Sequence, residues 1–182
     1  MFTRPCRGLV LTCCICVLLA LAACGKTESP KPGGGPTGVK PVAPTAPKGG
    51  IPFVSSGLAL GKKWTASSSI EGWSDSGRMT DAPGNRIFFH TKEEESSWLD
   101  IDLETATPVS SVEVLNRTDC CGERAIPLII ELSTDHTTWK EVARRTEAFL
   151  DFRATFSTQN ARYVRLRVPR RTHLHLERVG VR

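Results

Sequence analysis

Hydrophobic and polar residues alternate along most of the chain that follows Ile51. In residues 98–103, for example, Leu99, Ile101 and Leu103 are separated by single aspartates. Because successive side chains of a strand point to opposite faces, this period of two predicts strands with one buried face. The same alternation recurs in residues 112–114, 128–132, 150–156, 163–168 and 174–181. The pattern predicts an all-β sandwich, and only residues 139–148 offer an alternative, which is one short helical turn.

Residues 1–23 have the pattern of a bacterial signal peptide. Arg4 and Arg7 form a positive start, and the apolar stretch 9–21 is short for a membrane span. Residues 21–24 read Leu-Ala-Ala-Cys, which resembles a bacterial lipobox, in which Cys24 becomes the lipidated first residue. A plain signal peptide or an uncleaved anchor is the alternative. We therefore expect an exported lipoprotein of the cell envelope, held by the outer membrane or at the cell surface rather than by the inner membrane.

The segment from Cys24 to residue 50 has the composition of a linker. Half of the 26 residues at 25–50 are proline or glycine, and the segment has almost no aliphatic side chains. Such a sequence buries too little apolar surface to offset the entropy of ordering, so we expect a disordered tether. This division predicts a signal peptide at 1–23, a lipidated cysteine and linker at 24–50, and one domain at 51–182.

The net charge of +5 belongs to the leader and the linker rather than to the domain. From Ile51 onward the chain has 18 basic and 18 acidic residues, so the domain lacks the positive charge that a nucleic-acid binder needs. Residues 71–104 contain nine acids and three bases, whereas residues 144–182 contain ten arginines and three acids. We expect these two oppositely charged segments to be neighbours in the fold.

Two adjacent cysteines, Cys120 and Cys121, lie between Arg117 and Arg124 on a predicted loop between strands. Neighbouring Cα atoms are only about 3.8 Å apart, so a disulfide between them would be strained. Cleavage before Cys24 would nevertheless leave these two cysteines as the only free-thiol candidates of the domain. In an exported, oxidising setting, an even pair favours a disulfide over a thiol nucleophile.

Residues 116–124 read Asn-Arg-Thr-Asp-Cys-Cys-Gly-Glu-Arg and resemble the Asn-Arg-x-Asp-Cys-Cys-x-Glu-Arg signature of fucolectin-type lectins in the discoidin (coagulation factor V/VIII type C) family. The resemblance implies that Cys120 and Cys121 form a vicinal disulfide that packs against a sugar, and that Arg117 and Arg124 bind this sugar. It also extends over roughly residues 57–182, because 58–68, 98–103, 133–139 and 161–166 are similar to motifs of the family. The resemblance implies an eight-stranded jelly-roll β-sandwich, the galactose-binding-like fold.

His90 is the remaining candidate for the sugar site. Fucolectins supply a sugar-binding histidine from an aromatic-aromatic-His segment, and residues 88–90 read Phe-Phe-His. An imidazole and two guanidiniums can form several directed hydrogen bonds with hydroxyls and a ring oxygen. The alternative is structural: Arg117 pairs with Asp119, Arg124 pairs with Glu123 or Glu93, and His90 packs within its loop. The glutamates at 93–95 could also neutralise the arginines.

The sequence offers two candidate metal sites, a calcium loop and a pair of histidines. Members of the family hold a structural calcium through an Ala-Ile-Asp-Gly loop and a glutamate near the C-terminus. Residues 80–85 instead read Thr-Asp-Ala-Pro-Gly-Asn, and Arg178 stands at the glutamate position with Glu177 beside it. The resemblance thus allows a calcium ion, whereas these departures argue against it. His173 and His175 alternate with Glu177, but an exposed strand face explains this spacing better than a zinc site does.

No phosphate-binding loop, nucleophile elbow or paired-carboxylate motif is present, so we do not expect an enzyme. The sequence therefore predicts a lipid-anchored module that binds carbohydrate, fucose or a related glycan. The alternative is a module that binds a protein or another envelope component without binding sugar. Docking to a membrane through the domain itself would require protruding apolar residues, of which Trp73 is one candidate.

Overall fold

The computed structural model describes residues 55–82 and 89–182. These residues form antiparallel strands and one short 3-10 helix. The elements are β1 (Lys63–Ala66), β2 (Ser76–Arg78), β3 (Trp98–Leu115), η1 (Gly122–Ala125), β4 (Leu128–Ser133), β5 (Lys140–Arg145), β6 (Asp151–Arg167) and β7 (Arg178–Val181). In this part of the chain no helix is long and apolar enough to cross a membrane.

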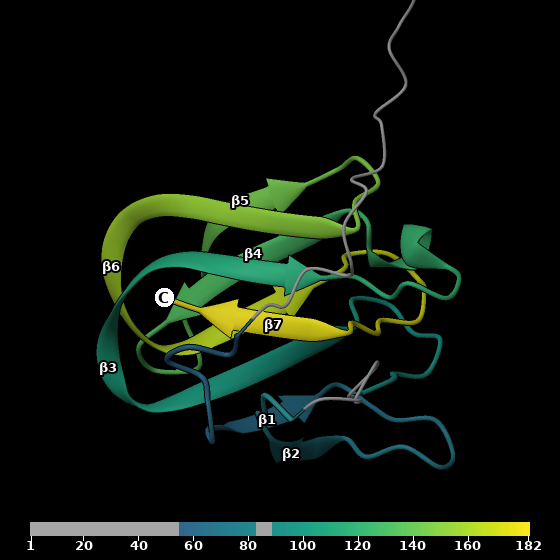
Figure 1. Cartoon of the computed structure of the whole chain (residues 1–182), viewed down its shortest axis with the longest axis horizontal. Helices are drawn as coiled ribbons and strands as arrows, with labels where there is room; N and C mark the ends of the chain where they lie inside the picture. Colours follow the sequence, from purple (N-terminus) through teal and green to yellow (C-terminus); the bar gives the residue numbers. More distant parts are fainter. Residues whose placement is uncertain (1–54, 83–88) are drawn as a thin grey trace, which may run out of the picture. The chain divides into compact units, whose positions relative to one another are not determined.

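The two longest strands, β3 and β6, build both layers of the sandwich. The strands follow the hydrogen-bonded order β2-β1-β3-β6-β4-β5, and β7 pairs with β3 outside this order. The first half of β3 lies between β1 and the second half of β6, while its second half lies between β7 and the first half of β6. Figure 1 shows both strands curving around one side of the molecule. The register shifts after Asp102, where Glu104 has a φ of 71°, which is the irregularity that lets β3 bend.

The alternation read from the sequence has its expected physical basis. Leu99 and Ile101 from one half of β3, Val112 and Val114 from the other half, and Val179 of β7 are all fully buried. They belong to one hydrophobic cluster that fills the space between the layers. The prediction of an all-β sandwich is therefore confirmed.

The division into strands differs in detail from the prediction. Residues 98–103 and 112–114, expected as separate strands, are parts of β3, and residues 150–156 and 164–168 are parts of β6. The described residues consequently contain seven strands where we expected eight. Residues 140–145 form β5 against β4, so the alternative of a helical turn there is wrong. Pairing with a neighbour decides this, because a short polar sequence specifies neither state alone.

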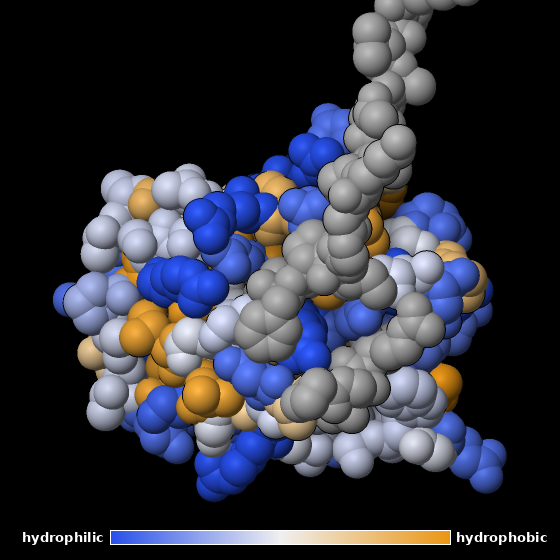
Figure 2. Space-filling model, in the orientation of Figure 1, coloured by the Kyte–Doolittle hydropathy of each residue, from blue (hydrophilic) through white to orange (hydrophobic). Residues whose placement is uncertain are grey.

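The acidic and basic segments are neighbours, as expected. Asp100 of β3 accepts two hydrogen bonds from Arg165 of β6, at 2.7 and 2.8 Å. Asp102 accepts two from Arg162, at 2.9 and 3.0 Å. The charge segregation of the sequence thus reflects cross-strand ion pairs. On the face seen in Figure 2, polar side chains accordingly surround scattered apolar patches.

Candidate functional site

The two cysteines lie on the loop that connects β3 to β4. Cys120 and Cys121 are joined by a disulfide, which confirms the predicted pairing. Cys121 has a φ of 58° and precedes η1, and its carbonyl oxygen accepts a hydrogen bond from the Arg124 amide at 3.1 Å. The disulfide and the first turn of η1 therefore form one rigid corner, with Cys120 exposed to solvent.

Asn116 fixes the base of this loop. Its side chain is completely buried at the end of β3. The amide nitrogen donates to the carbonyl oxygens of Gly122 at 2.8 Å and Phe149 at 3.2 Å, and the amide oxygen accepts from the Arg117 backbone N–H at 2.9 Å. One buried side chain thus ties both ends of the cysteine segment together.

Arg170 holds the other side of the loop from the C-terminal segment. Its guanidinium donates to the carbonyl oxygens of Ile126 at 2.7 Å and Glu123 at 2.9 Å. Glu123 lies within η1, the helix that carries Arg124, and Ile126 follows its last residue. Neither Asn116 nor Arg170 was among the residues predicted for the site. Asn116 begins the fucolectin-like signature, which was the available signal for it, whereas the contacts of Arg170 with distant carbonyl groups leave no local sequence signal.

Arg117 is held in a fixed orientation by Asp119. The guanidinium Nε lies 2.6 Å from one carboxylate oxygen and an Nη lies 2.5 Å from the other. This pairing raises the pKa of Arg117 and holds the pKa of Asp119 well below its ordinary value. A guanidinium has five N–H donors, so the pair leaves about three of them for another acceptor. The predicted Arg117–Asp119 ion pair is therefore present, but it does not use all the hydrogen-bond donors of Arg117.

Arg124 differs from Arg117 because its guanidinium has no hydrogen bond or ion pair within 55–82 and 89–182. The two carboxylates considered as its partners do not serve in this role. Glu93 lies 3.9 Å from Arg171, and Glu123 is exposed. Glu94 instead accepts hydrogen bonds from Ser67 and from a second serine beside it. The glutamates at 93–95 therefore leave this arginine available.

His90 is half-buried and has a defined tautomer. Its Nδ1 lies 2.9 Å from the carbonyl oxygen of Thr91, and the Nδ1 of His173 lies 3.0 Å from the same oxygen. A carbonyl oxygen can only accept, so Nδ1 of each ring carries the proton and donates. In the neutral imidazole of His90, Nε2 is then the unprotonated nitrogen that accepts a hydrogen bond.

Three imidazoles pack together at this end of the sandwich. The ring of His90 lies 5.2 Å from that of His173 and 4.8 Å from that of His175, between centroids. His175 is fully buried, and neither of its ring nitrogens has a hydrogen-bond partner within residues 55–82 and 89–182. The expectation of an exposed strand face at 173–177 is therefore wrong, because these residues belong to no strand and the ring of His175 packs against that of His90. The described residues contain no group of three side chains suited to hold a metal ion.

The positive charges of the two arginines act on the imidazoles of His90 and His175. Burial lowers the pKa of His90, and the positive charges of His173, Arg117 and Arg124 lower it further. Burial, followed by the charges of Arg117, His90 and Arg124, lowers the pKa of His175 to about 4. Near neutral pH the site thus places an uncharged imidazole beside two permanently charged guanidiniums.

Trp73 borders this site. Its ring lies 5.9 Å from that of His90, and 37% of the residue is exposed. The segment that carries it is anchored where the Ile70 amide donates to the carbonyl oxygen of His90 at 3.1 Å. Trp73 is therefore an aromatic wall of the candidate site rather than an isolated protrusion.

The structure brings five predicted residues to this one end of the sandwich: His90, Arg117, Cys120, Cys121 and Arg124. The sixth, the predicted lipidation residue Cys24, lies outside the described residues. Phe88 of the aromatic-aromatic-His segment also lies outside them. Phe89 is completely buried, where it anchors His90 to the core.

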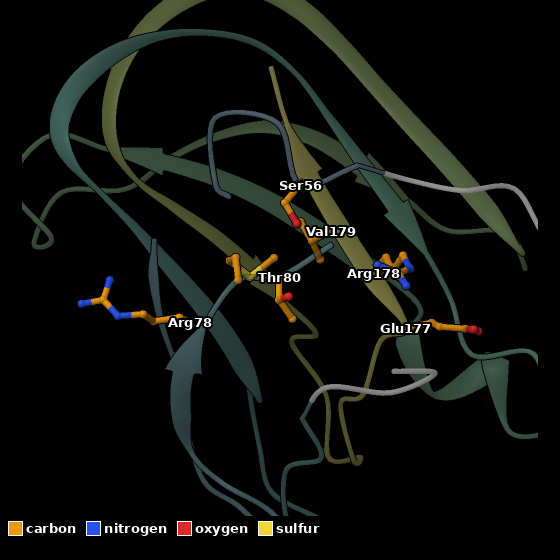
Figure 3. A pocket seen from close by; sticks show the side chains of 7 residues that line it. Ser56, Arg78, Thr80, Glu177, Arg178 and Val179 are labelled. Carbon is orange, nitrogen blue, oxygen red and sulfur yellow. The ribbon is translucent and has the colours of Figure 1, made fainter. Parts of the chain in front are cut away.

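The calcium expectation falls on the loop beside Glu177. A small cavity of about 20 Å³ lies there. Among its lining residues in Figure 3, the carboxylate of Glu177 points away from Thr80. Arg178 donates to the carbonyl oxygen of Ala82 at 3.1 Å, and the Asp81 carboxylate accepts from the Ser56 amide. A guanidinium thus contacts the carbonyl oxygen of Ala82, while the buried Oε2 of Glu177 has no hydrogen-bond partner among the described residues. Residues 83–85 of the loop lie outside the described part.

The domain was compared with known proteins. Residues 78–166 match the F5/F8 type C family model described as NedA-like, galactose-binding domain. The comparison with curated proteins gave no match.

Several solved structures share the fold. The lectin domain of lectinolysin, complexed with Lewis b antigen, is 24% identical with a TM-score of 0.57, and the match covers 71% of this chain and 97% of that one. A fucose binding module from Streptococcus pneumoniae is 25% identical with a TM-score of 0.56, covering 69% and 93%. A fucolectin from striped bass (Morone saxatilis) serum is 25% identical with a TM-score of 0.60, covering 69% and 48%. The chain therefore has the galactose-binding-like fold, and over residues 78–166 it matches the discoidin-like F5/F8 type C family.

Proposed function

We propose that this chain is a non-catalytic, lectin-like module of the discoidin family that binds fucose or a related sugar. The sugar lies between His90, Arg117 and Arg124, against the Cys120–Cys121 disulfide. The observation that carries the proposal is the pairing of one neutral, oriented imidazole with a free guanidinium and a fixed one. This combination has a specific chemical meaning.

A hydroxyl group both donates and accepts a hydrogen bond, and the site offers both functions. Nε2 of His90 accepts, while the open N–H groups of Arg117 and Arg124 donate. Vicinal hydroxyls of a sugar can therefore donate to the imidazole and accept from the guanidiniums at the same time. An anionic ligand would gain from the arginines but would find the accepting Nε2 unsuitable, so the arrangement favours a neutral polyol.

The apolar part of the site suits a sugar as well. Cys120 is exposed at the tip of the loop, and the Trp73 ring stands next to His90. Sugar rings carry apolar C–H faces between their hydroxyls, which pack against such surfaces. The fucose-binding module and the Lewis b complex among the structural neighbours support the same ligand class.

The proposal includes export and lipid anchoring at Cys24, followed by the linker that ends at residue 50. This arrangement would hold the sugar-binding domain away from a bacterial membrane. It rests on the lipobox-like sequence at 21–24 and on the proline and glycine content of the linker.

A glycan screen followed by calorimetric titration tests the proposed function. A hydrogen bond from a charged donor contributes roughly 1.5–3 kcal/mol to the free energy of binding. Its loss in Arg124→Ala should therefore weaken binding about ten- to a hundredfold. Arg117→Lys should also bind poorly, since a single ammonium cannot form the planar pair with Asp119 while it contacts sugar. Arg171→Ala is the matched control, because Arg171 is exposed and, among the residues that the structure describes, pairs only with Glu93.

The rival interaction module makes a different prediction for the same variants. Under that hypothesis Arg117→Ala lowers the melting temperature slightly, through loss of the Asp119 pair, and no glycan is bound by any variant. Equal sugar affinity in the parent, Arg124→Ala and Arg171→Ala would also exclude the proposed site.

A further inference from the structure

A second cavity, of about 270 Å³, opens on the outer face of the sheet. The side chains that line it and matter to its chemistry are Lys63, Thr65, Asp100, Asp102, His136 and Tyr163. Asp100 and Asp102 alternate with the buried Leu99 and Ile101, so their side chains lie on the face opposite the core. β1 forms one wall, and the turn between β4 and β5 forms the other.

This cavity is separate from the site at the disulfide. Along β4 and β6, the pair Ile129 and Arg167 lies near the start of β4, close to the cysteine loop, and the pair Ser133 and Tyr163 lies at its other end. Four residues separate the two pairs, which corresponds to about 13 Å along a strand. The cavity therefore belongs to the opposite end of the sheet from η1.

The floor of the cavity is rigid before any ligand arrives. Asp100 is 3% exposed and is held by two hydrogen bonds from Arg165 and one contact of 2.8 Å with Nε2 of His136. The Arg165 guanidinium is stacked between the rings of Trp98 and Trp139, at 4.9 and 3.9 Å from their centroids. These contacts fix the Asp100 carboxylate beneath the cavity.

The turn that carries His136 is equally well fixed. Ser133 Oγ accepts from the His136 amide at 2.9 Å, and Asp135 accepts from the amides of Thr137 and Thr138 at 2.8 Å each. These bonds lower the pKa of Asp135 well below its ordinary value. The His136 ring therefore stands in one place, 4.5 Å from the Tyr163 ring.

The polar groups around the cavity indicate the class of ligand. Arg165 and Arg162 neutralise the two carboxylates, and Asp102, whose side chain is 27% exposed, keeps a lone pair that can accept. Within the described residues, the Lys63 ammonium and the hydroxyls of Thr65 and Tyr163 form no hydrogen bond. Donors and acceptors thus alternate around a nearly neutral hollow with aromatic walls, which suits a polyhydroxylated ring better than an ion.

We propose that this cavity is a second sugar site that accommodates one pyranose unit. The inference rests on the proposed function only for the class of ligand, since the geometry is that of a different part of the sheet. Its volume lies near the lower end of the range for small-molecule sites, as a single sugar ring requires. Two sites on one domain would let a single chain bind a branched or clustered glycan with greater avidity than either site provides.

Protein-observed NMR titration of the full chain with L-fucose, D-galactose and N-acetyl-D-glucosamine tests the inference. At least one sugar should shift the amide signals of Thr65, Asp102 and Tyr163 in a saturable manner. Lys63→Ala, which removes a charged donor, should weaken this binding about tenfold. Lys62→Ala is the matched control, because Lys62 pairs with Glu104 outside the cavity lining and should leave the cavity binding unchanged.

The Arg124→Ala variant separates the two sites. Cavity shifts that persist in this variant, after the shifts around the disulfide are lost, establish an independent second site. Absence of saturable cavity shifts with all three sugars would overturn the inference, as would equal effects of Lys62→Ala and Lys63→Ala. Failure of the first site would show separately, as missing shifts at the cysteine loop while the cavity still binds.

Discussion

The buried imidazole of His175 makes the stability of the domain dependent on pH in a predictable window. In the unfolded chain a histidine takes up a proton near pH 6.5, whereas in the folded domain burial lowers the pKa of His175 to about 4. Between these values the unfolded state binds more protons than the folded state. The free energy of unfolding should therefore decrease as the pH falls from 6.5 to 4.

The magnitude follows from the same two values. A difference of about 2.5 pKa units corresponds to about 3 kcal/mol, most of which should be lost by pH 4.5. This is a large part of the stability of an ordinary domain. His90, whose pKa is lowered for the same reasons, adds to the loss with the same sign. The aspartates with lowered pKa values, such as Asp119 and Asp135, contribute only at more acidic pH, because their ordinary value is 3.8.

The decisive variant is His175→Leu, which replaces the buried imidazole by an apolar side chain. At pH 7 this variant should be as stable as the parent or more stable, because the imidazole nitrogens have no hydrogen-bond partner to lose in the described part of the chain. At pH 4.5 it should keep most of the stability that the parent loses. His90→Gln is the matched comparison, since His90 is only half-buried and should recover a smaller part.

Urea unfolding followed by tryptophan fluorescence, at several pH values from 7 to 4.5, measures these differences. Refolding at each pH must reproduce the unfolding curve for the free energies to be comparable. The reasoning is refuted if the parent keeps the same free energy of unfolding across this range. It is equally refuted if His175→Leu loses as much as the parent does.

Three further predictions concern other parts of the chain. Asn116→Ala should lower the free energy of unfolding by about 1–3 kcal/mol and weaken sugar binding, because it leaves buried carbonyl groups unpaired; urea unfolding and calorimetry measure the two effects. EDTA should leave the melting temperature unchanged, because the Arg178 guanidinium already contacts the Ala82 carbonyl; a lower melting temperature that calcium restores would contradict this. Cys24→Ser should release the protein from membranes or block its maturation, and unchanged membrane association and mass would disprove lipidation at this residue.

Much of the site could be predicted because it lies in one short segment. Residues 117–124 hold both arginines and both cysteines, and their order alone indicates a loop with a special role. His90 could be added only through resemblance to a family, since 26 residues separate it from Arg117. The roles of Asn116 and Arg170 could not be predicted, because both act through backbone carbonyl groups, which every residue possesses.

The sequence by itself determined which face of each strand is buried. Alternation with a period of two reports the side of a sheet on which a side chain lies, and it did so correctly for Leu99, Ile101, Val112 and Val114. The same alternation contains no information about where one strand ends and the next begins, so β3 and β6 were each expected as two strands. Their continuity depends on hydrogen bonds with neighbours on both sides.

The tertiary structure alone decided what happens to the polar residues between strands. His175 has the spacing of an exposed residue, yet its ring packs against that of His90, and both ring nitrogens lack a partner among the described residues. The sequence offered Glu93 as a partner for Arg124, but in the structure Glu93 pairs with Arg171 from the C-terminal segment. Burial and ion pairing of such residues depend on which distant segments meet, and local sequence patterns do not encode these meetings.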